Sequence, residues 1–286
     1  VDHVLRTATA LRTLERKDRD AVLALCALDP IPSVMLAERV QRAGAEPLRL
    51  GGEIWGFVEH GRLSSLCWAG ANLVPVNVST PAALDAFASR ARRAGGSFSS
   101  LFGPAEAVLG LWERLEPSGW RARHVRPSQP LCAISAPSAV TPDPLVVRGT
   151  PADLDAVLPA SIAMFTEEVG YSPVSGDGGA SYRRRVSELL REGRTYLRRG
   201  ADGQVVFKAD LGSVSSAVAQ VHGVWIDPRF RGRGLAAPAM SAVVSAALRD
   251  HAPVVSLYVN DYNHRALAAY RRVGFEQVGT FATVLF

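Results

Sequence analysis

The sequence predicts a mixed α/β fold in which a mostly antiparallel sheet is flanked by helices. Three observations support this fold class. The second half of the chain follows the order β-α-α-β-β-β-α-β-α-β-β, and turns at Gly203 and Gly212 separate its three consecutive strands. The first half repeats this order more loosely. The repeated order indicates an internal duplication.

A linker is expected between the two halves. The segment 135–144 contains three prolines and several small polar residues, a composition typical of semi-rigid linkers. We therefore expect an N-terminal domain over residues 1–134 and a C-terminal domain over residues 145–286. Both are close to the ordinary length of a domain.

In the C-terminal domain, helical spacing of apolar residues and short β-branched runs define the expected elements. The expected helices are 153–165, 182–191, 237–248 and 263–273. The expected strands are 145–148, 195–197, 205–209, 217–226 and 254–259, with two closing strands around 278 and at 280–286. A loop from Glu167 to Gly179 is expected between the first two helices.

The N-terminal domain is expected to be a degenerate copy of the C-terminal one. Its expected helices are 18–28, 35–43, 82–93 and 105–115, and its expected strands are 53–59, 63–68, 73–78 and 97–101. No glycine- and arginine-rich turn stands between Val78 and Ala82, where the other half has one.

Composition excludes several classes of protein. Of the 286 residues, 48% are hydrophobic and 21% are charged, which suits a chain with a buried core. No run reaches the roughly 18 apolar residues of a membrane helix, and the first residues have no signal-peptide pattern. Cys26, Cys67 and Cys132 form neither a disulfide framework nor a zinc motif. We therefore expect a cytoplasmic protein without a metal.

The net charge of +5 raises the question of a nucleic-acid partner. Nearly all the basic residues are arginines scattered over amphipathic segments, and no nucleic-acid-binding motif is present. Neither nucleic acid nor a membrane is therefore expected as a partner. An anionic small ligand suits the charge equally well.

The strongest chemical signal is the glycine- and arginine-rich turn at 224–236, between a strand and a helix. Gly232 and Gly234 permit turn conformations that a Cβ would forbid, and they let a phosphate approach the backbone. Arg231 and Arg233 add charged donors. The pattern is neither G-x-G-x-x-G nor a Walker A loop, which argues against a dinucleotide or ATP. A basic surface turn is the alternative interpretation.

A second signal lies on the helix expected at 263–273. Asn263 and Tyr270 are about two helical turns apart and share one face. Ala266 lies between them and keeps that face shallow enough for an extended ligand. Gly274 and Phe275 then end the helix. A core helix with a buried tyrosine would explain the same pattern.

Together and in this order, the two segments resemble the GNAT superfamily of acyl-CoA-dependent N-acyltransferases. Arg231, Gly234 and Ala236 match the family's cofactor motif, Gln/Arg-x-x-Gly-x-Gly/Ala. The family's later motif is matched by Asn260, Asn263, Ala266, Tyr270, Gly274 and Phe275. The resemblance covers about residues 145 to 286. The whole chain is also similar to tandem bacterial GNAT proteins with an active second half.

The resemblance implies a duplicated GNAT fold and direct attack of an acceptor amine on acetyl-CoA. It assigns pantetheine binding to the strand before the turn, and pyrophosphate binding to the turn itself. The implied cofactor-binding residues are Val224, Trp225, Ile226, Arg231, Gly232, Arg233, Gly234, Leu235, Ala236, Asn263 and Ala266. Tyr270 would protonate the departing thiolate, because a phenol with an ordinary pKa of about 10 is a suitable donor.

The residues leave the identity of the base open. Gln220 and His222 alternate onto one face of the strand before the turn, and His222 is preferred because an amide accepts no proton. A histidine hydrogen-bonded within the sheet is the alternative. Glu167 and Glu168, in the loop that covers the acceptor site in this family, come second. The carboxylate of Phe286 comes third.

Two functions remain open at this point. The first is an N-acetyltransferase for a small-molecule or protein amine, and Tyr171 lies with the acidic pair in the expected acceptor loop. The second is a non-catalytic acyl-CoA-binding module whose N-terminal half is an interaction surface. Tyr270 favours the first, because binding alone needs no proton donor there. A homodimer is left open. Lys208 and Asp210 could reach the acceptor pocket, but a solvated position on the surface is the preferred expectation.

Overall fold

The computed structural model describes residues 10–95, 98–175 and 177–286. By packing, the chain divides into two compact units. The N-terminal unit holds the chain up to Leu131 together with Tyr258–Tyr262 and Gln277–Phe286. The C-terminal unit holds Cys132–Leu257 and Asn263–Glu276.

The N-terminal unit is a sheet with helices on both faces. Its helices are α1 (Arg19–Leu28), α2 (Pro30–Ala43), α3 (Pro47–Leu50), α4 (Pro81–Ala94) and α5 (Ala105–Leu115). Across its sheet the strands follow the order β1 (Ala10–Thr13), β2 (Glu53–Glu59), β3 (Arg62–Ala69), β4 (Asn72–Val76), β5 (Ser100–Pro104), β12 (Glu276–Leu285) and β6 (His124–Ile134).

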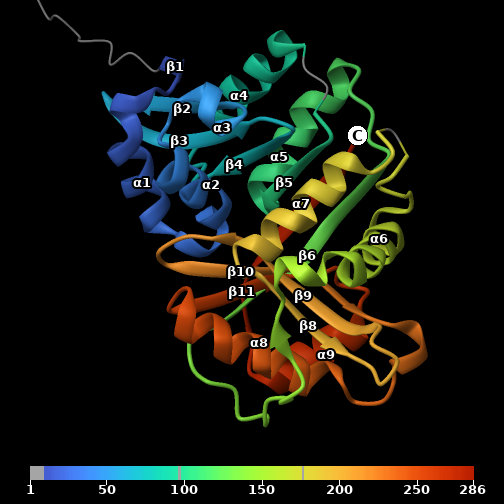
Figure 1. Ribbon diagram of the computed structural model, residues 1–286. Coiled ribbons are helices and arrows are strands. Elements are labelled where there is room, and N and C mark those ends of the chain that lie inside the picture. Colours follow the sequence, from blue (N-terminus) through green and yellow to red (C-terminus); the bar gives the residue numbers. More distant parts are fainter. Residues whose placement is uncertain (1–9, 96–97, 176) are drawn as a thin grey trace, which may run out of the picture. The chain divides into compact units, whose positions relative to one another are not determined.

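Alternation along these strands divides the core of the N-terminal unit into two layers. Ile54 and Leu66 pack with residues of α1 and α2, whereas their neighbours Trp55 and Cys67 pack with residues of α4 and α5. Successive side chains of a strand point to opposite faces, so both faces of the sheet are apolar and covered. Figure 1 shows α1 and α2 on one side of β2–β4 and α4 and α5 on the other.

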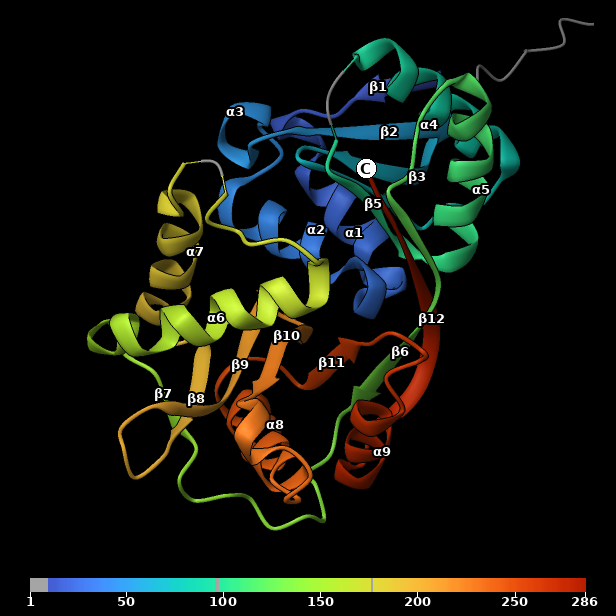
Figure 2. The same ribbon diagram turned by 90° about the vertical axis from the view of Figure 1, so that its right-hand side faces the viewer.

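The C-terminal unit is built in the same way. Its helices are α6 (Leu154–Val169), α7 (Ala180–Arg191), α8 (Ala236–Asp250) and α9 (His264–Val273). Its strands follow the order β11 (Val254–Tyr258), β10 (Val218–Ile226), β9 (Val205–Val214), β8 (Thr195–Arg199) and β7 (Val147–Arg148). Residues of α6 and α7 pack on Leu197 and Trp225 of this sheet, and α6 is seen crossing the strands in Figure 2.

The two units repeat one order of elements and strand directions. β1 to β4 pair antiparallel in succession and β4 is parallel to β5. β7 to β10 likewise pair antiparallel, and β10 is parallel to β11. In each unit a helix connects the two parallel strands, as a parallel crossover requires. The mixed, mostly antiparallel α/β fold predicted from the sequence is confirmed.

The last strand departs from the predicted domain ranges. β12 pairs antiparallel with β5, from Phe281 opposite Pro104 to Leu285 opposite Ser100. Ala282 is buried in the N-terminal core. The range 145–286 expected for the C-terminal domain therefore loses its final strand, because the apolar face of that strand completes the N-terminal sheet. The two closing strands expected from the sequence form this one continuous strand.

The exchange is reciprocal. The last residues of β6, from Cys132 to Ile134, belong to the C-terminal unit. Ile134 Cδ1 lies 3.2 Å from the position that a Cβ on Gly274 would take, at the end of α9. Each half of the sequence therefore contributes residues of its last strand to the other unit.

The expected linker is fixed to the C-terminal unit. Residues 135–144 form neither helix nor strand. Ser241 Oγ donates a hydrogen bond to Val140 O at 2.5 Å, and Asp143 N donates to Pro238 O at 3.0 Å. Asp143 also forms an ion pair of 2.9 Å with Arg198. The segment is therefore held along α8.

Other elements differ from the expected ones in extent. α6 continues to Val169, so Glu167 and Glu168 lie in its last turn and not in a loop. β1, α3 and β6 are elements that the sequence pattern does not predict. Ser97, expected to begin a strand, and Gly176, expected in the acceptor loop, lie outside the described residues.

Deletion of residues 277–286 should destabilise the N-terminal unit, although that unit is built mostly from the start of the chain. The deletion removes the buried side chains of Phe281 and Val284, each worth about 1.5–3 kcal/mol, so we expect a loss of at least about 3 kcal/mol in the free energy of unfolding. The ring of Phe286 lies 5.2 Å from that of Trp120 and 6.0 Å from that of Trp112. Chemical denaturation followed by tryptophan fluorescence therefore reports on this region.

The control for the deletion is Val278→Thr, at an exposed position of the same strand (52% exposed). It should change the free energy of unfolding by less than about 0.5 kcal/mol. A deletion variant as stable as the full chain would contradict the role assigned to β12.

Candidate active site

The β10–β11 pair opens at its carboxyl end. The two strands pair in parallel only from Val218 opposite Val254 to Gln220 opposite Ser256, although β10 continues to Ile226. Beyond Gln220, no described residue of β11 pairs with β10. The backbone groups on this edge are therefore available to an extended ligand, which could add as a further strand.

A β-bulge lies at the opening. β10 pairs with β9 on the edge that does not face β11. There the register steps from His222 opposite Asp210 to Trp225 opposite Lys208, which leaves one extra residue in β10. Gly223 lies in the bulge with a φ of +58°, a conformation that glycine adopts without steric cost. A bulge redirects backbone groups, so it can aim an N–H at a ligand that a regular strand would not reach.

The predicted glycine- and arginine-rich turn leads from β10 to α8. Gly232 and Gly234 have φ values of +75° and +76°, and a Cβ on either would meet nothing within 4 Å. Leu235 precedes α8 as its N-cap and makes no side-chain capping hydrogen bond. The first N–H groups of α8 therefore lack a side-chain acceptor, and the helix dipole favours an anion there.

The corresponding helix of the N-terminal unit is closed by a cap. Thr80 accepts a hydrogen bond of 3.3 Å from Ala83 N, and Pro81 occupies the first position of α4. The threonine hydroxyl therefore takes up an N–H of the kind that remains open at α8. This difference distinguishes the two units at equivalent places in the fold.

Arg231 ties the turn to β10 and to α6. Its Nε donates to Ile226 O at 2.8 Å, and its Nη2 lies 2.7 and 3.1 Å from the carboxylate oxygens of Glu167. Trp225 Nε1 donates to the same carboxylate at 3.3 Å. The sequence predicts a phosphate contact for Arg231 and a proton-accepting role for Glu167. In this structure the two side chains bind each other.

Asn263 caps α9. Its Oδ1 accepts a hydrogen bond of 3.2 Å from Ala266 N. The sequence predicts both residues as cofactor contacts. An asparagine immediately before a helix is itself a capping signal, so the structural role of Asn263 was also legible in the sequence.

Tyr270 is buried near the end of α9, with its ring 5.9 Å from that of Phe275. Burial raises the pKa of Tyr270 above its ordinary value, and electrostatic interactions with Glu168 and Cys132 add to the shift. The phenol therefore stays protonated at physiological pH. A proton that is present and held in one place is what a general acid requires.

His222 is held inside the sheet by neighbouring groups. Burial lowers its pKa to about 4, Arg185 adds to the shift, and Asp210 opposes it. His222 Nε2 lies 2.8 Å from Gln220 Oε1, and a Cβ on Gly212 would come within 2.2 Å of His222 Nδ1. The ordinary pKa of about 6.5, on which the choice of His222 as base rests, does not hold in this environment.

A buried ion pair lies beside the bulge. The expectation that Lys208 and Asp210 are solvated is wrong, because Lys208 is 0% exposed and Asp210 is 7% exposed. Lys208 Nζ lies 2.5 Å from Asp210 Oδ2, and Thr195 Oγ1 donates to Asp210 Oδ1 at 2.8 Å. Each buried charge is thus paired, which makes burial tolerable. The signal available in the sequence was the two-residue spacing, which places both charges on one face of a strand.

The two remaining candidates, Tyr171 and Phe286, make contacts of their own. Tyr171 follows α6, packs edge-to-face on Phe165 with ring centres 5.6 Å apart, and is 45% exposed. Phe286 belongs to the N-terminal unit, where its ring meets Trp112 and Trp120. Its carboxylate is therefore not among the groups of the C-terminal unit.

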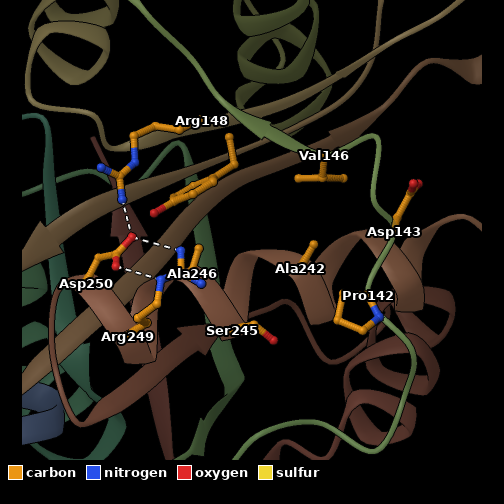
Figure 3. A pocket seen from close by; sticks show the side chains of 10 residues that line it. Pro142, Asp143, Val146, Arg148, Ala242, Ser245, Ala246, Arg249 and Asp250 are labelled. Carbon is orange, nitrogen blue, oxygen red and sulfur yellow. Dashed lines mark hydrogen bonds and ion pairs between the residues drawn. The ribbon is translucent and has the colours of Figure 1, made fainter.

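A separate cavity of about 660 Å³ lies along α8, against the segment that joins the two halves. Figure 3 shows Arg148 and Arg249 both directed at Asp250, with Ala242 and Ala246 of α8 along the cavity wall. None of the predicted site residues lines it. The cavity is therefore distinct from the candidate active site.

Other chemistries find little support in the described part of the chain. No group of histidine, cysteine or acidic side chains there is arranged to hold a metal ion. No described helix has the length and apolar character needed to cross a membrane. Burial raises the pKa of the Cys26 and Cys67 thiols to about 12, so neither supplies a reactive thiolate.

Comparison with known protein families agrees with this geometry. Residues 181–275 match the acetyltransferase (GNAT) family. Residues 52–157 match a domain of unknown function, DUF4081. The C-terminal part of the chain is therefore a GNAT acetyltransferase domain, as the two sequence motifs indicate, and a domain of a different description precedes it.

One curated relative supports the same class. An uncharacterized N-acetyltransferase of Methanocaldococcus jannaschii is 35% identical over 60 residues. The match covers 21% of this chain and 26% of that protein, about a quarter of its length.

Solved structures extend the likeness to the whole chain. A GCN5-related N-acetyltransferase from Sphaerobacter thermophilus has a TM-score of 0.58 at 18% identity and covers 96% of this chain and 94% of its own. A GNAT-family acetyltransferase from Colwellia psychrerythraea has a TM-score of 0.55 at 11% identity, over 97% and 99%. A tandem GNAT protein from the clavulanic acid biosynthesis pathway has a TM-score of 0.52 at 15% identity, over 96% and 98%. At these identities the likeness concerns the fold.

The stability of the protein should fall as the pH drops from about 6.5 towards 4. His222 has a pKa of about 4 when folded and about 6.5 when unfolded, so the unfolded chain binds more protons between these values. The contribution of neutral His222 to the free energy of unfolding is complete above about pH 6.5. It is lost as the pH falls through the window, by on the order of 2 kcal/mol at pH 4.5.

Denaturation curves at pH 7 and pH 4.5 test this prediction. His222→Gln keeps a donor for Gln220 but cannot titrate, so it should lose less stability between the two pH values than the unmodified chain. His264→Gln, at an exposed position, is the control and should behave like the unmodified chain. Equal pH dependence in His222→Gln and the unmodified chain would refute the assignment.

Proposed function

We propose that the chain transfers an acetyl group from acetyl-CoA to a primary amine by direct attack. The observation that carries this proposal is the uncapped N-terminus of α8, which follows a turn with two positive-φ glycines. It lies at the end of the strand β10, which has parted from β11. This arrangement offers donors to a pyrophosphate and a free strand edge to a pantetheine chain.

The residues of the turn fit such a donor. Open space around Gly232 and Gly234 lets a phosphate reach the backbone. The N–H groups from Gly232 to Ala236 would hold the pyrophosphate, whereas that of Arg231 already donates to Pro228 O. Residues 224–226 would pair with the pantetheine. Arg233 lies over the ring of Phe230 at 5.1 Å, which keeps its charge beside the turn.

The proposed reaction needs three contributions from the protein. An N–H of the bulge would stabilise the negative charge that develops on the thioester oxygen. As the new N–C bond forms and the C–S bond breaks, Tyr270 would give its proton to the departing sulfur. The amine proton would pass to Glu168, which lies close enough to affect the pKa of Tyr270. His222, the base preferred from the sequence, is the weaker candidate, because its pKa of about 4 makes it a poor proton acceptor.

The acceptor is proposed to be a cationic small-molecule or protein amine. Glu168 supplies negative charge at the end of α6, next to Glu167, whose carboxylate is paired with Arg231, and Tyr171 follows them. This negative charge would therefore attract the protonated acceptor amine before the amine loses its proton. This charge is the feature that favours a cationic acceptor over a neutral one.

Acetyl-CoA turnover over a panel of amines tests the proposal, with Tyr270→Phe as the comparison. The variant should bind acetyl-CoA with nearly the same affinity but turn over about 10²–10⁴-fold more slowly, because the lost hydroxyl matters only as charge develops on sulfur. A loss of less than about threefold would contradict the role of Tyr270. Binding of acetyl-CoA with no turnover of any amine would favour the acyl-CoA-binding module instead.

Gly234→Ala should raise the Kd of acetyl-CoA about tenfold or more, measured by calorimetry. The added Cβ blocks the approach of the phosphate, and each 1.4 kcal/mol of lost binding is a factor of ten. Gly203→Ala is a matched control, because its φ of +78° is nearly the same and it lies in the β8–β9 turn. The two variants carry the same backbone strain, so an equal effect on affinity would mean that the turn does not bind the cofactor.

A further inference from the structure

We propose that Lys208 is a positioning residue for acetyl transfer, which orients and polarises the Gly223–Val224 peptide so that Val224 N–H can bind the thioester oxygen. This inference rests on the proposed function. It starts from the buried ion pair of Lys208 and Asp210 beside the bulge, which has no role in the acetyl transfer proposed so far.

Lys208 Nζ has two partners within hydrogen-bonding distance. It lies 2.5 Å from Asp210 Oδ2 and 3.2 Å from Gly223 O. The side chain is 0% exposed, so protein groups take the place of water around the ammonium. An apolar pair of similar volume is often at least as stable as a buried ion pair. The retained charge is therefore better explained by what it contacts than by stability.

The contact is made with one end of a peptide group. The carbonyl of Gly223 and the N–H of Val224 belong to the same peptide, and no peptide bond in the described residues is cis. In a trans peptide the two groups point in opposite directions. Lys208 therefore holds the carbonyl end, and the N–H is directed away from it.

A cation at the carbonyl end has two consequences for the N–H. It fixes the plane of the peptide, and it draws electron density towards the oxygen, which makes the N–H a stronger donor. Thr195 Oγ1 holds Asp210 Oδ1 at 2.8 Å, so the carboxylate that orients Lys208 is itself oriented. The chain of contacts ends at the bulge.

Val224 lies where such a donor is useful. It follows the last pair of β10 with β11, in the stretch of β10 that β11 leaves free. A donor that is fixed before the reaction costs no reorganisation when negative charge appears on the thioester oxygen. Lys208 does not touch the reacting atoms in this scheme and acts only through the peptide.

Infrared spectroscopy of acetyl-CoA labelled with ¹³C at the thioester carbonyl provides the test, with the full chain. Hydrogen bonding should lower the carbonyl stretching frequency of bound acetyl-CoA relative to the free compound. The paired variant Lys208→Met with Asp210→Asn removes the cation without leaving a buried carboxylate unpaired. Its band should return towards the free position and its kcat should fall about tenfold or more, while the Kd of acetyl-CoA changes less than about threefold.

Three further variants separate positioning from stability. Lys208→Gln with Asp210→Asn keeps a neutral donor at the same place and should give part of the loss. Lys208→Arg keeps the cation and should retain most of the band shift. Thr195→Val removes the hydrogen bond that orients Asp210 but leaves the cation in place, so its band position and kcat should fall between those of the unmodified chain and those of the Lys208→Met pair.

The outcomes distinguish this inference from the proposed function. Either paired variant that binds acetyl-CoA with the unmodified band position and kcat overturns the role of Lys208 and leaves the proposed function intact. An unmodified chain that binds no acetyl-CoA refutes the proposed function, and the role of Lys208 with it.

Discussion

The parting of β10 from β11 after Gln220 is the constraint on which the candidate active site depends. A parallel pair that continued along both strands would use up the backbone groups that an extended ligand needs. Three features follow the parting along the chain: the bulge at Gly223, the turn that leads into α8, and the contacts of Arg231 with Ile226 and Glu167. The chemistry of the unit is thus set mainly by backbone geometry, and the side chains serve to hold that geometry.

Local features of the site could be predicted from the sequence, because they are determined by neighbours along the chain. Glycines at Gly232 and Gly234 indicate a turn with positive φ, and the spacing from Asn263 to Tyr270 indicates a helical face. The end of α6 could also be predicted from the sequence, because glycine is a common helix terminator. Gly170 ends α6 with a φ of +86°, which places Glu167 inside the last turn.

The remaining features depend on residues that are distant in sequence. Alternating apolar residues identify β12 as a strand, but they do not reveal that its partner is β5. Charged residues in a strand suggest a solvated face, yet Lys208 and Asp210 are buried because each satisfies the other. The pKa of His222 falls to about 4 through burial, which no local pattern records. The sequence therefore does not reveal which strands pair or which side chains are buried from solvent.

The exchange of last strands has a consequence for synthesis of the protein on the ribosome. Thr283 of β12 donates a hydrogen bond to Gln129 in the N-terminal unit, across 154 residues. The nascent N-terminal half therefore emerges with an unfilled place in its sheet, and that place stays open until the second half has been translated. A sheet edge exposed for this long invites pairing with other chains. We expect nascent chains to depend on chaperones during this interval, because the N-terminal sheet is completed only once β12 has been made.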